Sequence, residues 1–164
     1  LIAGKVNDMI NTSLRQIAFH CFETRVHAER QKGELSAERI EEIWLEEMQT
    51  SLGEHVVVDE NSRYIWSIVS HFFHSPFYVY AYSFADCLVN SLYQVYQEGS
   101  VKDFPEKYMQ MLSETGVKRY DELLKPFGLD AKSPEFWNKG LGLISSYIDE
   151  LERLDKKLSK AGLI

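Results

Sequence analysis

Apolar residues recur at helical spacing along nearly the whole chain, and this pattern constrains the fold more than any other feature. From position 2 to position 31, apolar side chains return every three or four residues at Val6, Ile10, Leu14, Ile17 and Cys21, with Phe22 beside the last. This is the period of an amphipathic helix. Ser36 is a good N-cap for a second helix that we expect to continue to about Leu52. Gly33 and Gly53 follow the two patterns and are typical of helix ends.

The remaining segments also predict helices. Residues 53–63 resemble a loop, with Val56 to Val58 as a short extended piece, and residues 64–69 predict a short helix or an extended run. Ser75 and Pro76 form a good N-cap and first turn for a helix that ends before Gly99. That helix is apolar nearly all round, which predicts a central, buried position. Further helices are expected over residues 104–115, 119–127 and 133–160. We predict an all-α fold, an irregular multi-helix bundle that forms one domain over residues 1–164.

Composition excludes several classes of function. The chain has 164 residues, 45% of them hydrophobic, and a net charge of −7 without any basic cluster, which argues against nucleic-acid binding. It contains no apolar run of about 18 residues and no signal-peptide pattern, so we expect no membrane association. Cys21 and Cys87 lie in apolar helical contexts and predict buried free thiols of a reducing, cytoplasmic compartment. Because the chain opens on Leu1 in the middle of a helical pattern, we expect it to be part of a longer polypeptide.

Metal-binding and nucleophilic patterns are absent from the sequence. None of the five histidines begins an HExxH motif. Glu23 and His27 lie four residues apart on one helical face, whereas di-iron bundles use Glu-x-x-His pairs on two helices. The simplest explanation of that pair is a hydrogen bond or an ion pair between the two side chains. Glu42 and Glu46 are typical of a solvated helix surface, since paired carboxylates do acid–base work only when burial raises one pKa. We predict that this chain alone binds no metal.

The segment from His71 to Tyr82 carries the most functional information. Two histidines, His71 and His74, stand just before an expected helix start, where free N–H groups suit an anionic or carbonyl ligand. Three tyrosines follow, and on a helix Tyr78 and Tyr82 share a face while Tyr80 lies on the other side. Spacing alone leaves two interpretations open. The tyrosines are either core residues with hydrogen-bonded hydroxyl groups or part of a wall that binds a peptide or carbonyl group.

Several stretches form a pattern in order along the chain. The most specific stretch is His71-Phe72-Phe73 followed by Pro76-Phe77-Tyr78-Val79-Tyr80-x-Tyr82. The others are Ile10-Asn11-Thr12-x-x-Arg15-Gln16, Phe22-Glu23, Gly33-Glu34-Leu35-Ser36, Trp66, Gly116, Leu123-Leu124, Phe127-Gly128-Leu129-Asp130 and Leu151-Glu152. Together these stretches resemble the C-terminal part of the oligoendopeptidase F family of thimet-oligopeptidase-like zinc metallopeptidases.

The resemblance implies a helical catalytic domain with a deep channel that hydrolyses short peptides. In that family an HExxH helix and a later glutamate hold zinc, and we expect both to lie before Leu1, so the isolated chain should be inactive. Family members bind the substrate backbone and stabilise the tetrahedral intermediate with a histidine and tyrosines of this segment. His71 matches the histidine, and Tyr80 is our first candidate for the hydroxyl donor. Tyr78, Tyr82 and His74 are further candidates for substrate binding, whereas Phe73 replaces a tyrosine found in many relatives.

A second class of function remains open. The chain could instead be a non-catalytic helical module that binds a peptide or a partner helix in an aromatic groove. An HExxH motif in the parent polypeptide would decide for the enzyme. If the chain is a wall of a larger domain, it should expose apolar surface and self-associate.

Overall fold

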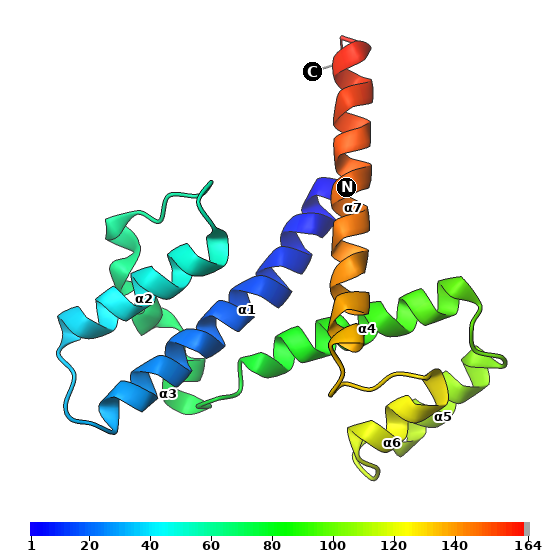
Figure 1. Cartoon of the computed structure of the whole chain (residues 1–164), viewed down its shortest axis with the longest axis horizontal. Helices are drawn as coiled ribbons and strands as arrows, with labels where there is room; N and C mark the ends of the chain where they lie inside the picture. The colour runs from blue at the N-terminus through cyan, green and yellow to red at the C-terminus, as the bar shows by residue number, and fades with distance from the viewer. Residues whose placement is uncertain (163–164) are drawn as a thin grey trace. The chain divides into compact units, whose positions relative to one another are not determined.

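The computed structural model describes residues 1–162, and these residues form helices joined by short connections (Figure 1). The elements are α1 (Ile2–Arg30), α2 (Ala37–Leu52), η1 (Glu60–Ile68), α3 (His71–His74), α4 (Tyr80–Glu98), α5 (Phe104–Glu114), α6 (Tyr120–Leu124), η2 (Lys125–Phe127) and α7 (Pro134–Lys160). Outside the helices, the described residues contain a single isolated β-bridge, between Thr115 and Lys118, and no strand. The predicted all-α fold is confirmed. No helix of the described chain is both long enough and apolar enough to cross a membrane.

Local capping signals set the ends of α2 and α7 as the sequence predicts. The Ser36 hydroxyl accepts a hydrogen bond from the Arg39 N–H at 3.2 Å, and Gly53 ends α2 with a φ of 76°. Ser133 caps α7 in the same way, since its hydroxyl accepts from the Glu135 N–H at 3.2 Å, with Pro134 in the first turn. A side-chain acceptor at the N-cap satisfies one of the N–H groups that the helix leaves unpaired.

The predicted start of the aromatic helix is wrong. Instead of a helix from Ser75, the chain forms the four-residue helix α3, a turn over residues 75–79, and then α4 from Tyr80. Phe77 lies in this turn with a left-handed φ of 60°, which interrupts the helix. Upstream, η1 begins at Glu60 within the expected loop, capped by the Asp59 side chain, and Val56 to Val58 form no strand.

Two further predictions concern burial, and both are wrong in part. The helix expected to be buried all round, α4, has one buried face that includes Ser83, Cys87 and Ser91. The helix also exposes large side chains: Tyr80 in its first turn, and Tyr82, Val89, Tyr93 and Tyr96. Both cysteines are free thiols, but only Cys87 is buried, whereas Cys21 is exposed. Tyrosine and valine satisfy an apolar pattern without being covered, so the pattern overestimates burial.

The chain divides into two compact units. Unit 1 combines Leu1–Met9 with the chain from Ala85 onward, and unit 2 is Ile10–Phe84. In unit 2, the short connection between α1 and α2 makes the two helices antiparallel, and ion pairs join them. Arg39 Nη2 lies 2.8 Å from Glu29 Oε1, and Arg25 Nη1 lies 3.1 Å from Glu47 Oε1. These pairs are partly exposed, so their contribution to stability is small.

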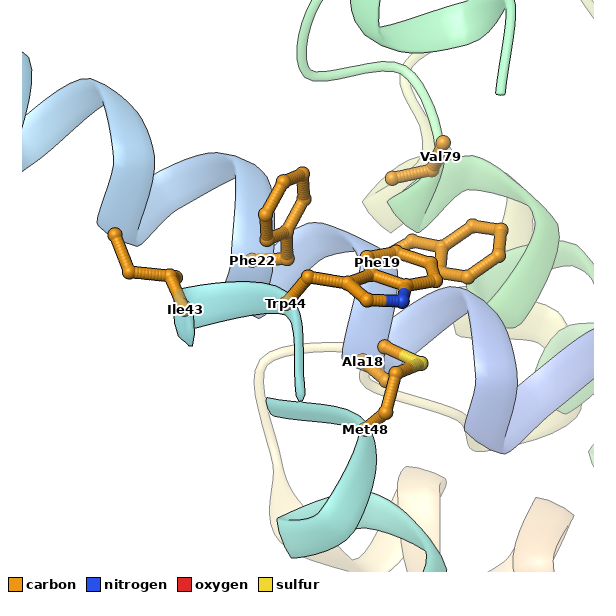
Figure 2. Packing of buried hydrophobic residues seen from close by; sticks show 7 residues of the cluster. All are labelled: Ala18, Phe19, Phe22, Ile43, Trp44, Met48 and Val79. Carbon is orange, nitrogen blue, oxygen red and sulfur yellow. The ribbon is translucent and has the colours of Figure 1, made fainter. Parts of the chain in front are cut away.

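Unit 2 is built around a cluster of aromatic and aliphatic side chains (Figure 2). Its buried members are Ala18, Phe19, Phe22, Ile43, Trp44, Met48 and Val79. The Trp44 ring lies between those of Phe19 and Phe22, with centroid distances of 5.3 and 5.2 Å. Its Nε1 donates a hydrogen bond to the Ser62 carbonyl oxygen at 3.1 Å, so the indole is buried with its polar atom satisfied.

Unit 1 packs α4 against α7 through small residues. A Cβ added to Gly140 of α7 would lie 2.8 Å from the Cys87 carbonyl oxygen of α4. One helical turn along α4, the Ser91 hydroxyl donates to the Phe136 carbonyl oxygen at 3.0 Å. The buried apolar residues of unit 1 include Leu124, Phe127, Phe136 and Ile144. The absent side chain of Gly140 therefore allows the two backbones to touch.

Candidate functional site

The segment from His71 to Tyr82 is held on the core of unit 2 at two points. Phe72 packs with its ring centroid 5.1 Å from Phe22 and 5.6 Å from Phe19, and Val79 is almost fully buried in the same cluster. A helix of four residues is not stable by itself. The position of α3 is therefore determined by these tertiary contacts.

Three of the predicted site residues come together, and we call His71, Tyr78 and Tyr82 the tyrosine cluster. His71 Nε2 and the Tyr82 hydroxyl oxygen are 2.9 Å apart and share a hydrogen bond. The rings of Tyr78 and His71 are nearly parallel, at 7°, with centroids 6.2 Å apart, and Tyr78 meets Tyr82 edge-on at 5.7 Å. Tyr78 and Tyr82 keep 52% and 38% of their surface exposed. The cluster is thus an ordered group of polar rings that a ligand can reach.

The other two predicted residues lie apart from this hydrogen bond. The Tyr80 ring meets the edge of His20, with centroids 6.0 Å apart, and is 55% exposed. His74 ends α3 with an exposed side chain. None of the three tyrosines is buried. Tyr78 and Tyr82 lie together and Tyr80 lies beside His20, although Tyr78 belongs to the turn before α4 and not to a helix shared with the other two.

Glu23 of α1 is a site residue whose part the sequence reasoning missed. Its side chain is buried, and its Oε1 accepts a hydrogen bond from the Phe77 N–H at 2.7 Å. Its Oε2 is buried and has no hydrogen-bond partner among the described residues. The expected pairing of Glu23 with His27 does not occur, because the His27 ring packs against Phe77 instead, at 4.7 Å. The signal in the sequence was an acid beside Phe22 on the apolar side of a helix, where charges are rare.

The described residues do not form a metal centre. No three His, Cys, Asp or Glu side chains among them lie close enough to hold a metal ion. The zinc ion that the resemblance implies therefore does not fit this part of the chain.

An apolar groove lies elsewhere on unit 2. It has a volume of about 550 Å³ and is formed by α1, α2 and residues 56–65, with Leu14, Trp44, Met48 and Leu52 among its lining. None of the tyrosine-cluster residues lines it. Its concave apolar surface is of the size that suits a side chain or a short peptide.

Comparison with known proteins gives a consistent answer. The family model described as Peptidase family M3 matches residues 1–143. Among curated proteins, the chain is 29% identical over 153 residues to an oligopeptidase PepF of Bacillus subtilis and 27% identical over 151 residues to an oligoendopeptidase F homolog of Borreliella burgdorferi. Each match covers 92% of this chain but only 22% and 25% of the relatives, so the chain spans about a quarter of their length. No solved structure matches.

Proposed function

Because the chain belongs to peptidase family M3, we propose that it forms a substrate-binding wall of a zinc-dependent oligoendopeptidase that hydrolyses short peptides. The observation that carries this proposal is the exposed hydrogen bond between His71 and Tyr82, with Tyr78 stacked beside it. The names of the two relatives, an oligopeptidase and an oligoendopeptidase F homolog, support peptides as substrates. In this proposal the zinc ligands and the general base belong to residues outside positions 1–164.

The tyrosine cluster can supply a hydrogen-bond donor to a reacting peptide. Peptide hydrolysis passes through a tetrahedral intermediate with a negative oxygen, and positioned N–H and O–H donors stabilise that oxygen. When the Nε2 proton of His71 is donated to the Tyr82 oxygen, the Tyr82 hydroxyl proton is left free for a substrate oxygen. The hydrogen bond to Tyr82 fixes the orientation of the imidazole, and the Tyr78 ring lies parallel to it, with the ring centroids 6.2 Å apart. The pair would then bind the substrate carbonyl in one orientation.

We assign the donor role to Tyr82 rather than to Tyr80. Tyr80, the first candidate from the sequence, lies beside His20 and has no ring contact with His71. It remains a candidate for substrate contact outside the tyrosine cluster, as does the exposed His74. The same proposal places the enzyme in the cytoplasm, because Cys21 and Cys87 are free thiols and free thiols are typical of a reducing compartment.

Steady-state kinetics on short fluorogenic peptides test the assignment in the complete natural polypeptide that contains residues 1–164. Tyr82→Phe removes one hydroxyl group and is expected to lower kcat by roughly 10²–10³-fold with little change in KM. His71→Ala should lower kcat/KM and also raise KM if His71 holds the substrate backbone. Tyr93→Phe is the control, since Tyr93 lies further along α4 and its hydroxyl accepts from Gln97 Nε2.

The comparison of Tyr82→Phe with Tyr80→Phe decides between the two donors. Loss of turnover in Tyr80→Phe, with normal turnover in Tyr82→Phe, would assign the role to Tyr80. Normal turnover in both, and in Tyr78→Phe, would show that the segment has no part in the chemical step.

The groove on unit 2 favours the second candidate function, a non-catalytic module that binds a peptide or a partner helix. The two functions differ in a simple measurement. A complete polypeptide that hydrolyses peptides and loses this activity with a chelator supports the enzyme, whereas one that only binds peptides supports the module. Under the first proposal the isolated 164-residue chain is inactive and associates through exposed apolar side chains, which light scattering would detect.

A further inference from the structure

Glu23 is a buried acid with only half of its carboxylate group satisfied. The residue is 2% exposed, and its Oε1 accepts from the Phe77 N–H at 2.7 Å. Its Oε2 lacks a hydrogen-bond partner within residues 1–162. Removing a carboxylate from water is unfavourable unless the group makes strong hydrogen bonds. Within residues 1–162, the bond from the Phe77 N–H is the one hydrogen bond that the buried carboxyl group makes.

The backbone that Glu23 holds is itself strained. Phe77 has a φ of 60°, a left-handed conformation that L-residues other than glycine, asparagine and aspartate seldom adopt. A hydrogen bond from a backbone N–H to a charged acceptor is stronger than one to a neutral acceptor. Glu23 thus stabilises the left-handed conformation in the turn between α3 and α4, and it does so from a helix 54 positions earlier in the sequence.

This turn places the tyrosine cluster. Tyr78 lies between Phe77, fixed by Glu23, and Val79, which is 1% exposed in the core of unit 2. With both neighbours fixed, the Tyr78 side chain is directed outward, where its ring stacks on His71. If the Phe77 N–H lost its acceptor, the turn could relax toward the helix that the sequence alone predicts from Ser75. The geometry between Tyr78, His71 and Tyr82 would then change.

We propose that Glu23 is a positioning residue that sets the tyrosine cluster by fixing the left-handed turn at Phe77. Glu23 acts through the backbone of residues 75–79 and does not itself contact substrate. The proposal rests on the proposed function for its kinetic consequence, whereas its structural consequence, the protection of the turn, can be measured without any activity.

Two variants separate the hydrogen bond from the charge. Glu23→Gln keeps an oxygen at the same distance from the backbone, so it can still accept from the Phe77 N–H. Glu23→Asp keeps the charge but withdraws the oxygen by one methylene group. Positioning predicts that Gln preserves function better than Asp, whereas a requirement for charge predicts the reverse order. Glu23→Ala removes both features, and the Gln–Asp pair decides the question if the Ala variant does not fold.

The measurements are hydrogen–deuterium exchange over residues 75–79 and kinetics on a short fluorogenic peptide, both in the complete natural polypeptide. In Glu23→Ala and Glu23→Asp, exchange of the turn should accelerate and kcat should fall by roughly 10- to 100-fold, because small displacements of a substrate-positioning group cost that much. In Glu23→Gln, kcat should stay within about threefold of the wild type, since the neutral bond is only weakened.

Glu29→Ala is the matched control. Glu29 lies on the same helix and pairs with Arg39 at 2.8 Å, so its loss removes an ion pair of α1 without touching the turn. Exchange over residues 75–79 and kcat should both stay at the wild-type level.

The outcomes distinguish this proposal from the function on which it rests. Normal exchange and kcat in Glu23→Ala, together with a loss of turnover in Tyr82→Phe, would overturn the positioning role and leave the proposed function intact. Better retention of kcat in Glu23→Asp than in Glu23→Gln would also overturn it. Faster exchange in Glu23→Ala with normal turnover in both Glu23→Ala and Tyr82→Phe would overturn the proposed function and the kinetic role of Glu23, while the structural role would stand.

Discussion

The two units of the chain bury their helices in opposite ways. In unit 2, large aromatic rings fill the space between α1 and α2, with Trp44 between Phe19 and Phe22. In unit 1, α4 and α7 meet at small residues, and the space between Gly140 and Cys87 is too small for a Cβ at position 140. Unit 2 is stabilised by large side chains that fill its core, whereas the helix contact in unit 1 requires that position 140 carry no Cβ. Unit 2 should therefore be sensitive to lost volume, and unit 1 to added volume.

This difference bears on the candidate site, which lies on unit 2. The helix that carries His71, α3, is only four residues long. Phe72 within this helix and Val79 after it pack into the aromatic core. The tyrosine cluster thus takes its position from large buried side chains and from the Glu23 hydrogen bond. In unit 1, the exposed tyrosines of α4 contact residues that lie close by in the sequence: Tyr96 meets the Phe104 ring at 5.3 Å, and the Tyr93 hydroxyl accepts a hydrogen bond from Gln97 Nε2.

The largest effect is expected from Trp44→Ala in unit 2. Trp44 is 2% exposed and joins α2 to α1 and, through Ser62, to η1. Truncation leaves a cavity that the surrounding rings cannot fill, so the free energy of unfolding should fall by about 3–5 kcal/mol. Trp44→Phe is the control, because it keeps the aromatic volume in part and loses the Ser62 bond. Urea unfolding followed by circular dichroism measures both, and a loss of less than about 1 kcal/mol for Trp44→Ala would contradict the account of the core.

A smaller effect of opposite origin is expected from Gly140→Ala in unit 1. The new Cβ would meet the Cys87 carbonyl oxygen at 2.8 Å and its Cα at 2.9 Å, so the helices must separate. The added methyl group should reduce the free energy of unfolding by about 1–3 kcal/mol.

Gly142→Ala provides the matched control on the same helix. Its Cβ would meet only Gln94 Nε2, at an ordinary 3.6 Å. Here the higher helix propensity of alanine should raise the free energy of unfolding by up to about 1 kcal/mol. Equal signs for the two substitutions would show that α4 and α7 do not depend on the small residue at position 140.

Much of the fold follows from residues that act locally. Ser36, Gly53 and Ser133 determine helix ends through contacts within a few positions, and the sequence predicts those ends correctly. Short motifs also indicate the family, and the family model confirms it. Such signals need no knowledge of tertiary structure.

The rest depends on distant partners. The sequence predicts a helix from Ser75 because Ser-Pro is a good local start, but the bond from Phe77 to Glu23 joins residues 54 positions apart. Which tyrosine lies beside His71 also depends on that turn, since Tyr78 lies before α4 rather than within it. For the same reason, the outer side of α4 was expected to be buried: its pattern is apolar, but whether anything covers it is a tertiary property.

The smallest effect concerns the two cysteines, one in each unit. Cys87 is 1% exposed at the contact with Gly140, and burial raises the pKa of its thiol from an ordinary 9.0 to about 11. Cys21 is exposed, and its pKa is raised by partial desolvation and by the nearby Glu47 carboxylate. In the folded chain at pH 8, iodoacetamide should modify Cys21 slowly and Cys87 only after unfolding, as peptide mass spectrometry would show.

The raised pKa of Cys87 also predicts how stability changes with pH. The folded state retains the thiol proton more strongly than the unfolded state. The contribution of the protonated Cys87 thiol to the free energy of unfolding is therefore complete below about pH 9 and is lost as pH rises toward 11. By pH 10 the loss should be about 1 kcal/mol.

Other groups titrate in this range, so the measurement is the difference in free energy of unfolding between the wild type and Cys87→Ala, from urea unfolding at pH 8 and pH 10. The destabilisation caused by Cys87→Ala should be smaller at pH 10. A constant difference, or rapid modification of Cys87 in the folded chain, would mean that α4 and α7 separate enough to admit water, and the tight packing inferred for unit 1 would then be wrong.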